Sequence, residues 1–134
     1  MIHIYCDGGS RGNPGKAAFG FVVKEDGKNV KEACGYIGIA TNNFAEYTAI
    51  IEALSWAKNA YKGADLEVFL DSKLAAFQLS GLYKIKNANI RNLVFKIKEL
   101  EPSFNKVIYR HIPREQNKEA DAQVNKALDN LKWN

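Results

Sequence analysis

Apolar and polar side chains alternate in the first part of the chain with the two-residue period of a β-strand. In residues 2–7 (IHIYCD), isoleucine and cysteine fall on one face and the other side chains on the opposite face. Residues 17–24 and 29–37 are two further strand-like runs, joined by a turn with the pair Asp26-Gly27, which is typical of tight hairpins. The pattern predicts an antiparallel meander of three strands.

The spacing of apolar residues then changes to that of α-helices. Residues 43–59 carry apolar side chains at helical spacing together with four alanines, and Asn43 can cap the start of this helix. The same reasoning predicts a strand at 66–70, helices at 72–80 and 89–100, a strand at 106–112 and a helix at 115–131. The predicted order is βββαβααβα, which indicates an α/β fold.

Two aspartates directly end or follow two of the predicted strands. A helix connects the third strand to the fourth, and right-handed crossovers with short loops favour a fourth strand beside the first and parallel to it. The first strand then separates the meander from the helix-linked strands. Open α/β sheets place their sites at such a point, at the carboxyl ends of the strands. We therefore expect Asp7 and Asp71 to lie close together.

Further acids could join this pair. Glu46 lies in the first turn of the predicted helix at 43–59, and Asp121 lies near the start of the last helix. Adjacent carboxylates repel each other and need a compensating cation if they are all ionised. Mg²⁺ takes oxygen ligands and is often held by a few carboxylates, so the pattern suggests a magnesium site.

Each acid also has a plainer role that the residue pattern leaves open. Glu46 stands at capping-box spacing from Asn43, and Asp121 suits the N-terminal turn of a helix through the helix dipole. Asp7 is an ordinary opener of a turn, and Asp71 could start the helix that follows it.

Composition limits the class of protein. The 134 residues suffice for one domain, and 46% apolar with 25% charged residues is ordinary for a soluble globular chain. The sequence has neither the roughly 18-residue apolar run of a membrane span nor a signal-peptide pattern. Cys6 and Cys34 lie in strand-like runs, which predicts buried free thiols and a cytoplasmic location. The net charge of +4 permits a polyanionic partner without requiring one.

Four ordered blocks of the sequence resemble the active-site blocks of type 1 ribonuclease H. They are YCDGGSRGNPGKAAFGFVV, TNNFAEYTAIIEAL, LDSKLAAFQLSG and HIPREQNKEADAQVNKAL, and each contains one of the acids above. The resemblance covers residues 2–129, and it implies that 1–134 is a single ribonuclease H domain. It also implies a five-stranded mixed sheet of order 3-2-1-4-5, flanked by helices.

The resemblance further implies an endonuclease that hydrolyses the RNA strand of RNA/DNA hybrids, leaving 5′-phosphate and 3′-hydroxyl ends. The family uses two Mg²⁺ or Mn²⁺ ions held by a D-E-D-D set. By motif position, this set is Asp7, Glu46, Asp71 and Asp121. Two-metal catalysis would activate a water with one ion and stabilise the leaving oxygen with the other.

Residues for substrate binding also follow from motif position. Contacts with the RNA 2′-hydroxyl, which distinguish RNA from DNA, are implied for Gly8, Ser10, Asn13, and Asn42 or Asn43. Thr41 with Asn42 resembles a pocket that binds a phosphate of the DNA strand. Lys73, with other lysines and an arginine nearby, could contact the backbone or form a solvated basic face.

Two positions compete for a role beside the acids. Members of the family often carry a histidine before the last acid, which is thought to help proton transfer or product release, and His111 matches its spacing in some members. Members with a block like PREQNKEAD use an arginine instead, so we favour Arg114, with His111 second. As a lone histidine, His111 is also compatible with a structural role.

The chain departs from many bacterial members in one region. They insert a basic, tryptophan-rich helix as a substrate handle, where this chain has only GLYKIKNAN. The resemblance thus predicts a handle-less, monomeric member, and some such members also cut double-stranded RNA. The alternatives are a non-catalytic hybrid-binding module and a DNA-cutting nuclease of the same fold.

Overall fold

A five-stranded mixed β-sheet runs through the centre of the computed structural model, which describes residues 1–81 and 84–131. The strands are β1 (Ile2–Arg11), β2 (Gly15–Glu25), β3 (Lys28–Ala40), β4 (Asp65–Leu70) and β5 (Lys106–His111). The helices are α1 (Asn42–Ala60), α2 (Lys73–Leu79), α3 (Ala88–Leu100) and α4 (Lys118–Asn130), with two 3₁₀ turns, η1 (Glu101–Ser103) and η2 (Arg114–Gln116). The predicted order of elements is confirmed.

The topology of the sheet is also the predicted one. The spatial order is β3-β2-β1-β4-β5. β1, β2 and β3 pair antiparallel, whereas β4 is parallel to β1 and β5 is parallel to β4. The hairpin between β2 and β3 turns at Asp26 and Gly27, whose φ angles of 53° and 78° suit the tight turn predicted there.

The first strand is longer than the sequence predicts. β1 continues beyond Asp7 because its backbone pairs with β2 as far as Arg11 opposite Lys16. Its parallel pairing with β4 ends earlier, at Cys6 opposite Leu70. The prediction of a strand ending at Asp7 was wrong because it treated the following glycines as a turn, whereas Gly8 and Gly9 lie within the strand.

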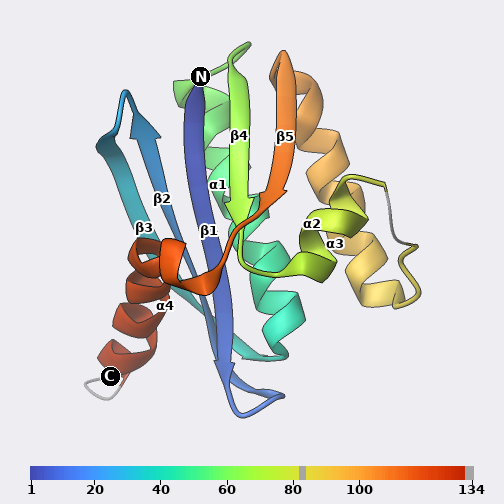
Figure 1. Ribbon diagram of the computed structural model, residues 1–134. Helices are drawn as coiled ribbons and strands as arrows, with labels where there is room; N and C mark the ends of the chain where they lie inside the picture. Colours follow the sequence, from blue (N-terminus) through green and yellow to red (C-terminus); the bar gives the residue numbers. More distant parts are fainter. Residues whose placement is uncertain (82–83, 132–134) are drawn as a thin grey trace.

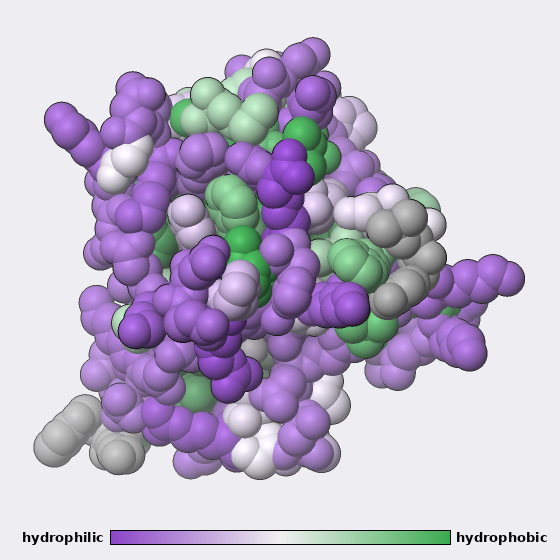
Figure 2. Space-filling view, viewed as in Figure 1, coloured by the Kyte–Doolittle hydropathy of each residue, from purple (hydrophilic) through white to green (hydrophobic). Residues whose placement is uncertain are grey.

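Helices cover both faces of the sheet. α1 packs against one face, with α2 and α3 next to it, and α4 packs across β1, β2 and β3 on the other face (Figure 1). The larger hydrophobic core lies between the sheet and α1, α2 and α3, and a smaller one of Ala18, Val124, Ala127 and Leu128 lies under α4. The face in Figure 2 is mostly hydrophilic, with apolar side chains in small separate groups.

Two helices begin at other residues than predicted. Thr41, not Asn43, caps α1, because its hydroxyl oxygen accepts a hydrogen bond from the Phe44 amide. α4 begins at Lys118 rather than at residue 115, since the chain first makes the η2 turn. Asn43 therefore lies inside α1, which excludes the capping-box role of Glu46.

The link between α2 and α3 is short. Among its described residues, 84–87 form no helix, so the structure shows no handle there. Leu82 and Tyr83, which also belong to this link, lie outside the described residues.

None of the helices in the described part of the chain has the length and apolar composition needed to cross a bilayer.

Candidate active site

Asp7 and Asp71 meet where β1 and β4 stop pairing. The last residues paired between these parallel strands are Cys6 and Leu70, and the two aspartates directly follow them. Asp7 is 9% exposed, and its Oδ1 accepts a hydrogen bond from the Gly8 amide at 2.9 Å. The topology therefore brings together the first two predicted acids, as the sequence suggests.

The pKa of Asp7 responds to the three other predicted acids. Burial raises the pKa of Asp7 to about 8, and the charge of Asp71 adds to this effect. A hydrogen bond and the charge of Asp121 raise this pKa further, as does the charge of Glu46. Asp71, Asp121 and Glu46 thus all lie close enough to Asp7 to influence its pKa.

Glu46 reaches the same site from the second turn of α1, because the helix begins at Asn42, one residue earlier than predicted. Burial raises its pKa to about 7 and the charge of Asp71 adds to this effect, whereas a hydrogen bond from Ser72 and the charge of Arg114 act in the opposite direction. Its Oε2 atom is buried and has no hydrogen-bond partner among the described residues. A buried carboxylate oxygen without a partner is costly, so this atom is suited to an added ligand.

Small residues allow α1 and α4 to pack closely on the sheet near Asp7. Four alanines of α1, at positions 45, 49, 53 and 57, are fully or almost fully buried on the face that packs on the sheet. A Cβ atom at Gly8 would lie 2.2 Å from the Ala45 carbonyl group of α1. At Gly20, which pairs with Asp7, it would lie 2.7 Å from the Ala120 oxygen of α4. Gly8 and Gly20 thus set the positions of Glu46 and Asp121.

Asp71 and Asp121 are connected through Asn117, which is buried. The Asn117 side-chain amide donates to Asp71 Oδ2 at 3.3 Å, and its backbone oxygen accepts from the Asp121 amide at 3.1 Å. Asp121 itself is exposed, and its Oδ2 accepts from Asn125 at 3.3 Å. The last acid therefore lies at the open side of the site.

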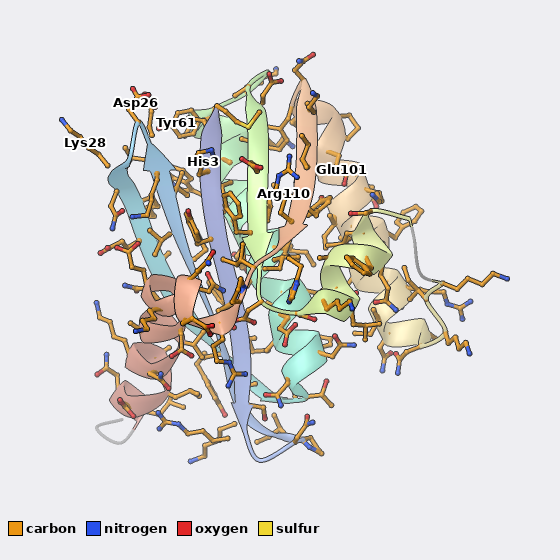
Figure 3. All side chains as sticks on the ribbon, in the orientation of Figure 1. His3, Asp26, Lys28, Tyr61, Glu101 and Arg110 are labelled. Atoms are coloured by element: carbon orange, nitrogen blue, oxygen red, sulfur yellow. The ribbon has the colours of Figure 1, made fainter. Side chains whose placement is uncertain are left out.

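Arg114 and His111 are both exposed, and the structure gives them different relations to the acids. The positive charge of Arg114, in η2, acts on Glu46 as described above. His111 ends β5 opposite Leu70, one residue before Asp71. The other histidine, His3, is engaged elsewhere: it lies near the beginning of β1 (Figure 3), with its Nε2 3.2 Å from Glu67.

Three of the predicted substrate residues form a hydrogen-bonded chain between β1, the following turn and the start of α1. The Ser10 amide donates to Asn42 Oδ1 at 2.7 Å, and the Asn42 amide donates to Asn13 Oδ1 at 3.0 Å. Both asparagine side chains thus accept through their oxygens. Their NH₂ groups make no hydrogen bond within residues 1–81 and 84–131, and since these groups can only donate, they can bind an acceptor such as a ribose hydroxyl.

A cleft of about 550 Å³ lies beside this chain of hydrogen bonds, and its lining includes Asn13, Thr41, Asn43 and Phe44. The Thr41 hydroxyl oxygen accepts from the helix, so its hydrogen can still be donated to a ligand. Lys73 lies at the start of α2 with its ammonium 5.5 Å from the Phe77 ring. The structure brings Asn13, Thr41, Asn42 and Asn43 together, with Lys73 on a separate helix.

The donor set fits a hard divalent cation, since it consists of carboxylate oxygens in a partly buried site with surplus negative charge. Within residues 1–81 and 84–131, no three His, Cys, Asp or Glu side chains are already arranged as metal ligands. Asp7 and Asp71 instead accept hydrogen bonds from protein groups. The assignment of the four acids as metal ligands therefore stays a prediction.

Comparison with known proteins places the chain in a family. A family profile described as "Reverse transcriptase-like" matches residues 5–127. The crystal structure of RNase H1 from the halophilic archaeon Halobacterium salinarum is 42% identical, covers 96% of this chain and 98% of its own, and superposes with a TM-score of 0.91. The chain belongs to the type 1 ribonuclease H family. LC11-RNase H1, solved in complex with an RNA/DNA hybrid, is a ribonuclease H with a TM-score of 0.94 and 38% identity, covering 98% of this chain and 99% of its own.

Curated ribonuclease H relatives include longer proteins. "Ribonuclease HI" of Halobacterium salinarum is 43% identical over 129 residues, which are 96% of this chain and 64% of that protein. "Bifunctional protein Rv2228c" of Mycobacterium tuberculosis is 38% identical over 96% of this chain and 35% of its own length. The chain thus spans less than two thirds of these curated relatives.

Three residues that contact the acids or the helices carrying them, Asn117, Ser72 and Gly20, were not identified from the sequence. Asn117 and Ser72 each stand before a helix, where such residues ordinarily act as caps. Gly20 lies inside an apolar strand-like run, where an isolated glycine indicates a bulge or a close backbone approach. That signal could have identified Gly20 as the position where a helix, here α4, packs closely on the sheet.

Proposed function

We propose that this chain is an endonuclease that hydrolyses the RNA strand of RNA/DNA hybrids. The observation that carries the proposal is the convergence of Asp7, Glu46, Asp71 and Asp121 at the end of β1 and β4, which leaves surplus negative charge around Asp7. A binding module for a polyanion has no use for such a cluster, whereas a metal-dependent nuclease requires it. Membership of the ribonuclease H family supports the same conclusion.

Metal dependence is part of the proposal. The four acids would hold two divalent ions, with Mg²⁺ as the proposed metal and Mn²⁺ as a substitute. When bound, such ions supply an activated water and stabilise the leaving oxygen of a phosphodiester, giving 5′-phosphate and 3′-hydroxyl products. The raised pKa values of Asp7 and Glu46 support this role, because a bound cation would favour their ionised forms.

The substrate residues form a surface next to these acids. The NH₂ groups of Asn13 and Asn42 are oriented as donors by their hydrogen-bonded oxygens, and they are proposed to contact ribose 2′-hydroxyls with the backbone of Gly8 and Ser10. Thr41, at the adjoining cleft, is proposed to bind a phosphate of the DNA strand together with Asn42, with Lys73 as a further cation. Asn43 lines the same cleft and is the alternative to Asn42 for the 2′-hydroxyl contact. The hybrid bound to LC11-RNase H1 supports this choice of substrate.

Arg114 is proposed to assist the reaction, in preference to His111. The positive charge of its guanidinium acts on Glu46. It can therefore stabilise negative charge beside the acids.

The cysteines support a cytoplasmic location, which we also propose. The two cysteines are free, and burial raises the pKa of the Cys6 thiol, which keeps it protonated and unreactive. Cys34 is only half-buried, and a reducing cytoplasm would keep it a thiol. We propose a monomer, which is usual for this fold.

A substrate panel tests the function. The wild-type protein with Mg²⁺ is incubated with an end-labelled RNA/DNA hybrid, double-stranded RNA and double-stranded DNA of one sequence. We expect internal cuts in the RNA strand of the hybrid, with 5′-phosphate and 3′-hydroxyl ends, and none in the DNA. Cutting of the DNA duplex alone would identify a DNA nuclease, and binding of the hybrid without cutting would identify a non-catalytic module. Cutting of both the hybrid and the RNA duplex would widen the substrate class.

A further inference from the structure

Asn117 is a buried polar residue between the acidic site and the start of α4. It is 1% exposed, and it occupies the position directly before the helix, where asparagine usually accepts a hydrogen bond from the first helical amides. Its side chain makes no such capping bond. The stabilisation available from a cap is therefore not the reason for asparagine at this position.

Asn117 makes hydrogen bonds to two of the four acids, Asp71 and Asp121, and to the residue that precedes a third, Asp7. The side-chain Nδ2 donates to the backbone oxygen of Cys6 at 2.8 Å, immediately before Asp7. It also donates to Asp71 Oδ2 at 3.3 Å. The backbone oxygen of Asn117 accepts from the Asp121 amide at 3.1 Å. One residue thus joins the ends of β1 and β4 to the first turn of α4.

Chemistry fixes the orientation of this amide. Cys6 O and Asp71 Oδ2 are both acceptors, so only the NH₂ group can face them, and a reversed amide would place three acceptors together. The consequence is that Asn117 Oδ1 is buried without a partner within the described part of the chain. An unpaired buried acceptor is costly, and an apolar residue would avoid it. The NH₂ group is therefore the feature that this position requires.

We propose that Asn117 is a positioning residue for the acidic site. Its NH₂ group bonds both Cys6 of β1 and Asp71, and so keeps Asp71 beside Asp7 although the two carboxylates repel each other. Its backbone oxygen bonds the Asp121 amide, which keeps the start of α4 at the same end of the sheet. The role rests on the proposed function, since it matters only if these carboxylates bind metal. Partners that orient metal-binding carboxylates typically change metal affinity or activity by roughly 10- to 100-fold when removed.

Two variants test this role. Asn117→Ala removes the amide, and Asn117→Asp keeps its shape but has no NH₂ group to donate. Calorimetric titration with Mg²⁺ in the absence of nucleic acid measures metal binding directly. We expect the Mg²⁺ concentration for half-saturation of Asn117→Ala to rise by about 10- to 100-fold. In hybrid cleavage, we expect kcat of both variants to fall by about 10- to 100-fold. KM should change by less than about twofold, because a buried residue does not touch the substrate.

Asn105→Ala is the matched control. Asn105 also donates its side-chain amide to an aspartate, Asp65 Oδ1 at 2.7 Å, at the opposite end of β4. We expect its metal binding and kcat to equal those of the wild type. Circular dichroism checks that each variant is folded.

Several outcomes would overturn the role of Asn117. They are wild-type Mg²⁺ binding by Asn117→Ala, wild-type kcat in Asn117→Asp, and loss of folding in both variants, which would make Asn117 a requirement of the fold. A wild-type protein that binds Mg²⁺ but cuts no hybrid would contradict the proposed function alone, because the titration still measures what Asn117 does.

Discussion

Buried negative charge governs the residues of the acidic site. Asp7 is the most affected, because it is almost fully buried and three other carboxylates act on it. Few groups among the described residues compensate this charge: the Gly8 amide binds Asp7, Asn117 binds Asp71, and Ser72 and Arg114 act on Glu46. In the absence of metal, this arrangement is expected to cost stability whenever Asp7 is ionised.

The metal-free protein should therefore lose stability as the pH rises. The pKa of Asp7 is about 8 in the folded protein against an ordinary value of 3.8, so the folded state holds a proton that the unfolded chain releases between these values. The contribution of Asp7 is fully present below about pH 4 and is lost as the pH rises towards 8. Urea unfolding in EDTA at pH 5 and pH 8 measures the difference, which Asp7→Asn should reduce. An equal loss in both proteins would contradict this account of Asp7.

Substitution of the two basic candidates separates their roles. Arg114→Ala should lower kcat by roughly tenfold or more, which corresponds to about 1.4 kcal/mol of lost stabilisation of charge. His111→Ala should lower it less, since only Arg114 is seen to act on an acid. Single-turnover cleavage of a hybrid at saturating Mg²⁺ compares them. The reverse order would assign the assisting role to His111.

Close packing of helices on the sheet determines where the acids stand. α1 has alanines on its contact face, and Gly8 of β1 lies where a Cβ atom would clash with the backbone of that helix. α4 makes the corresponding approach on the other face at Gly20, directly beside Asp7. Because Gly8 and Gly20 have no side chains, α1 and α4 can come close enough to bring Glu46 and Asp121 to Asp7.

Gly8 and Gly9 are neighbours in β1, and substituting each by alanine tests how closely α1 packs on this strand. A Cβ atom at Gly8 would lie 2.2 Å from the α1 backbone, whereas at Gly9 the nearest atom is Val124 Cγ1 at an ordinary 3.5 Å. Gly8→Ala should reduce the free energy of unfolding by about 3 kcal/mol and displace Glu46, with a large loss of hybrid cleavage. Gly9→Ala should remain close to the wild type in urea unfolding. Equal stability of the two variants would show that α1 can move away without cost.

For the molecule as a whole, the sequence predicts the order of elements and the sheet topology, because two-residue and helical periods are strong signals and crossover handedness limits the choices. It predicts the meeting of Asp7 and Asp71 for the same reason. It does not predict that β1 continues past Asp7, since a glycine required by close packing and a glycine required by a turn look alike in sequence. Asn117 was missed because its bonds to Cys6 and Asp71 join residues 111 and 46 positions apart.

If the four acids hold the metal ions that cut RNA in a hybrid, the substitution Asp71→Asn should abolish cutting. This variant keeps the shape of the side chain and removes one negative charge. Asp65→Asn, at the other end of β4, is the control. In cleavage of an end-labelled RNA/DNA hybrid with Mg²⁺, we predict that the wild type and Asp65→Asn cut the RNA strand, whereas Asp71→Asn and the wild type in EDTA do not. Undiminished cutting by folded Asp71→Asn would show that Asp71 holds no metal ion needed for the reaction.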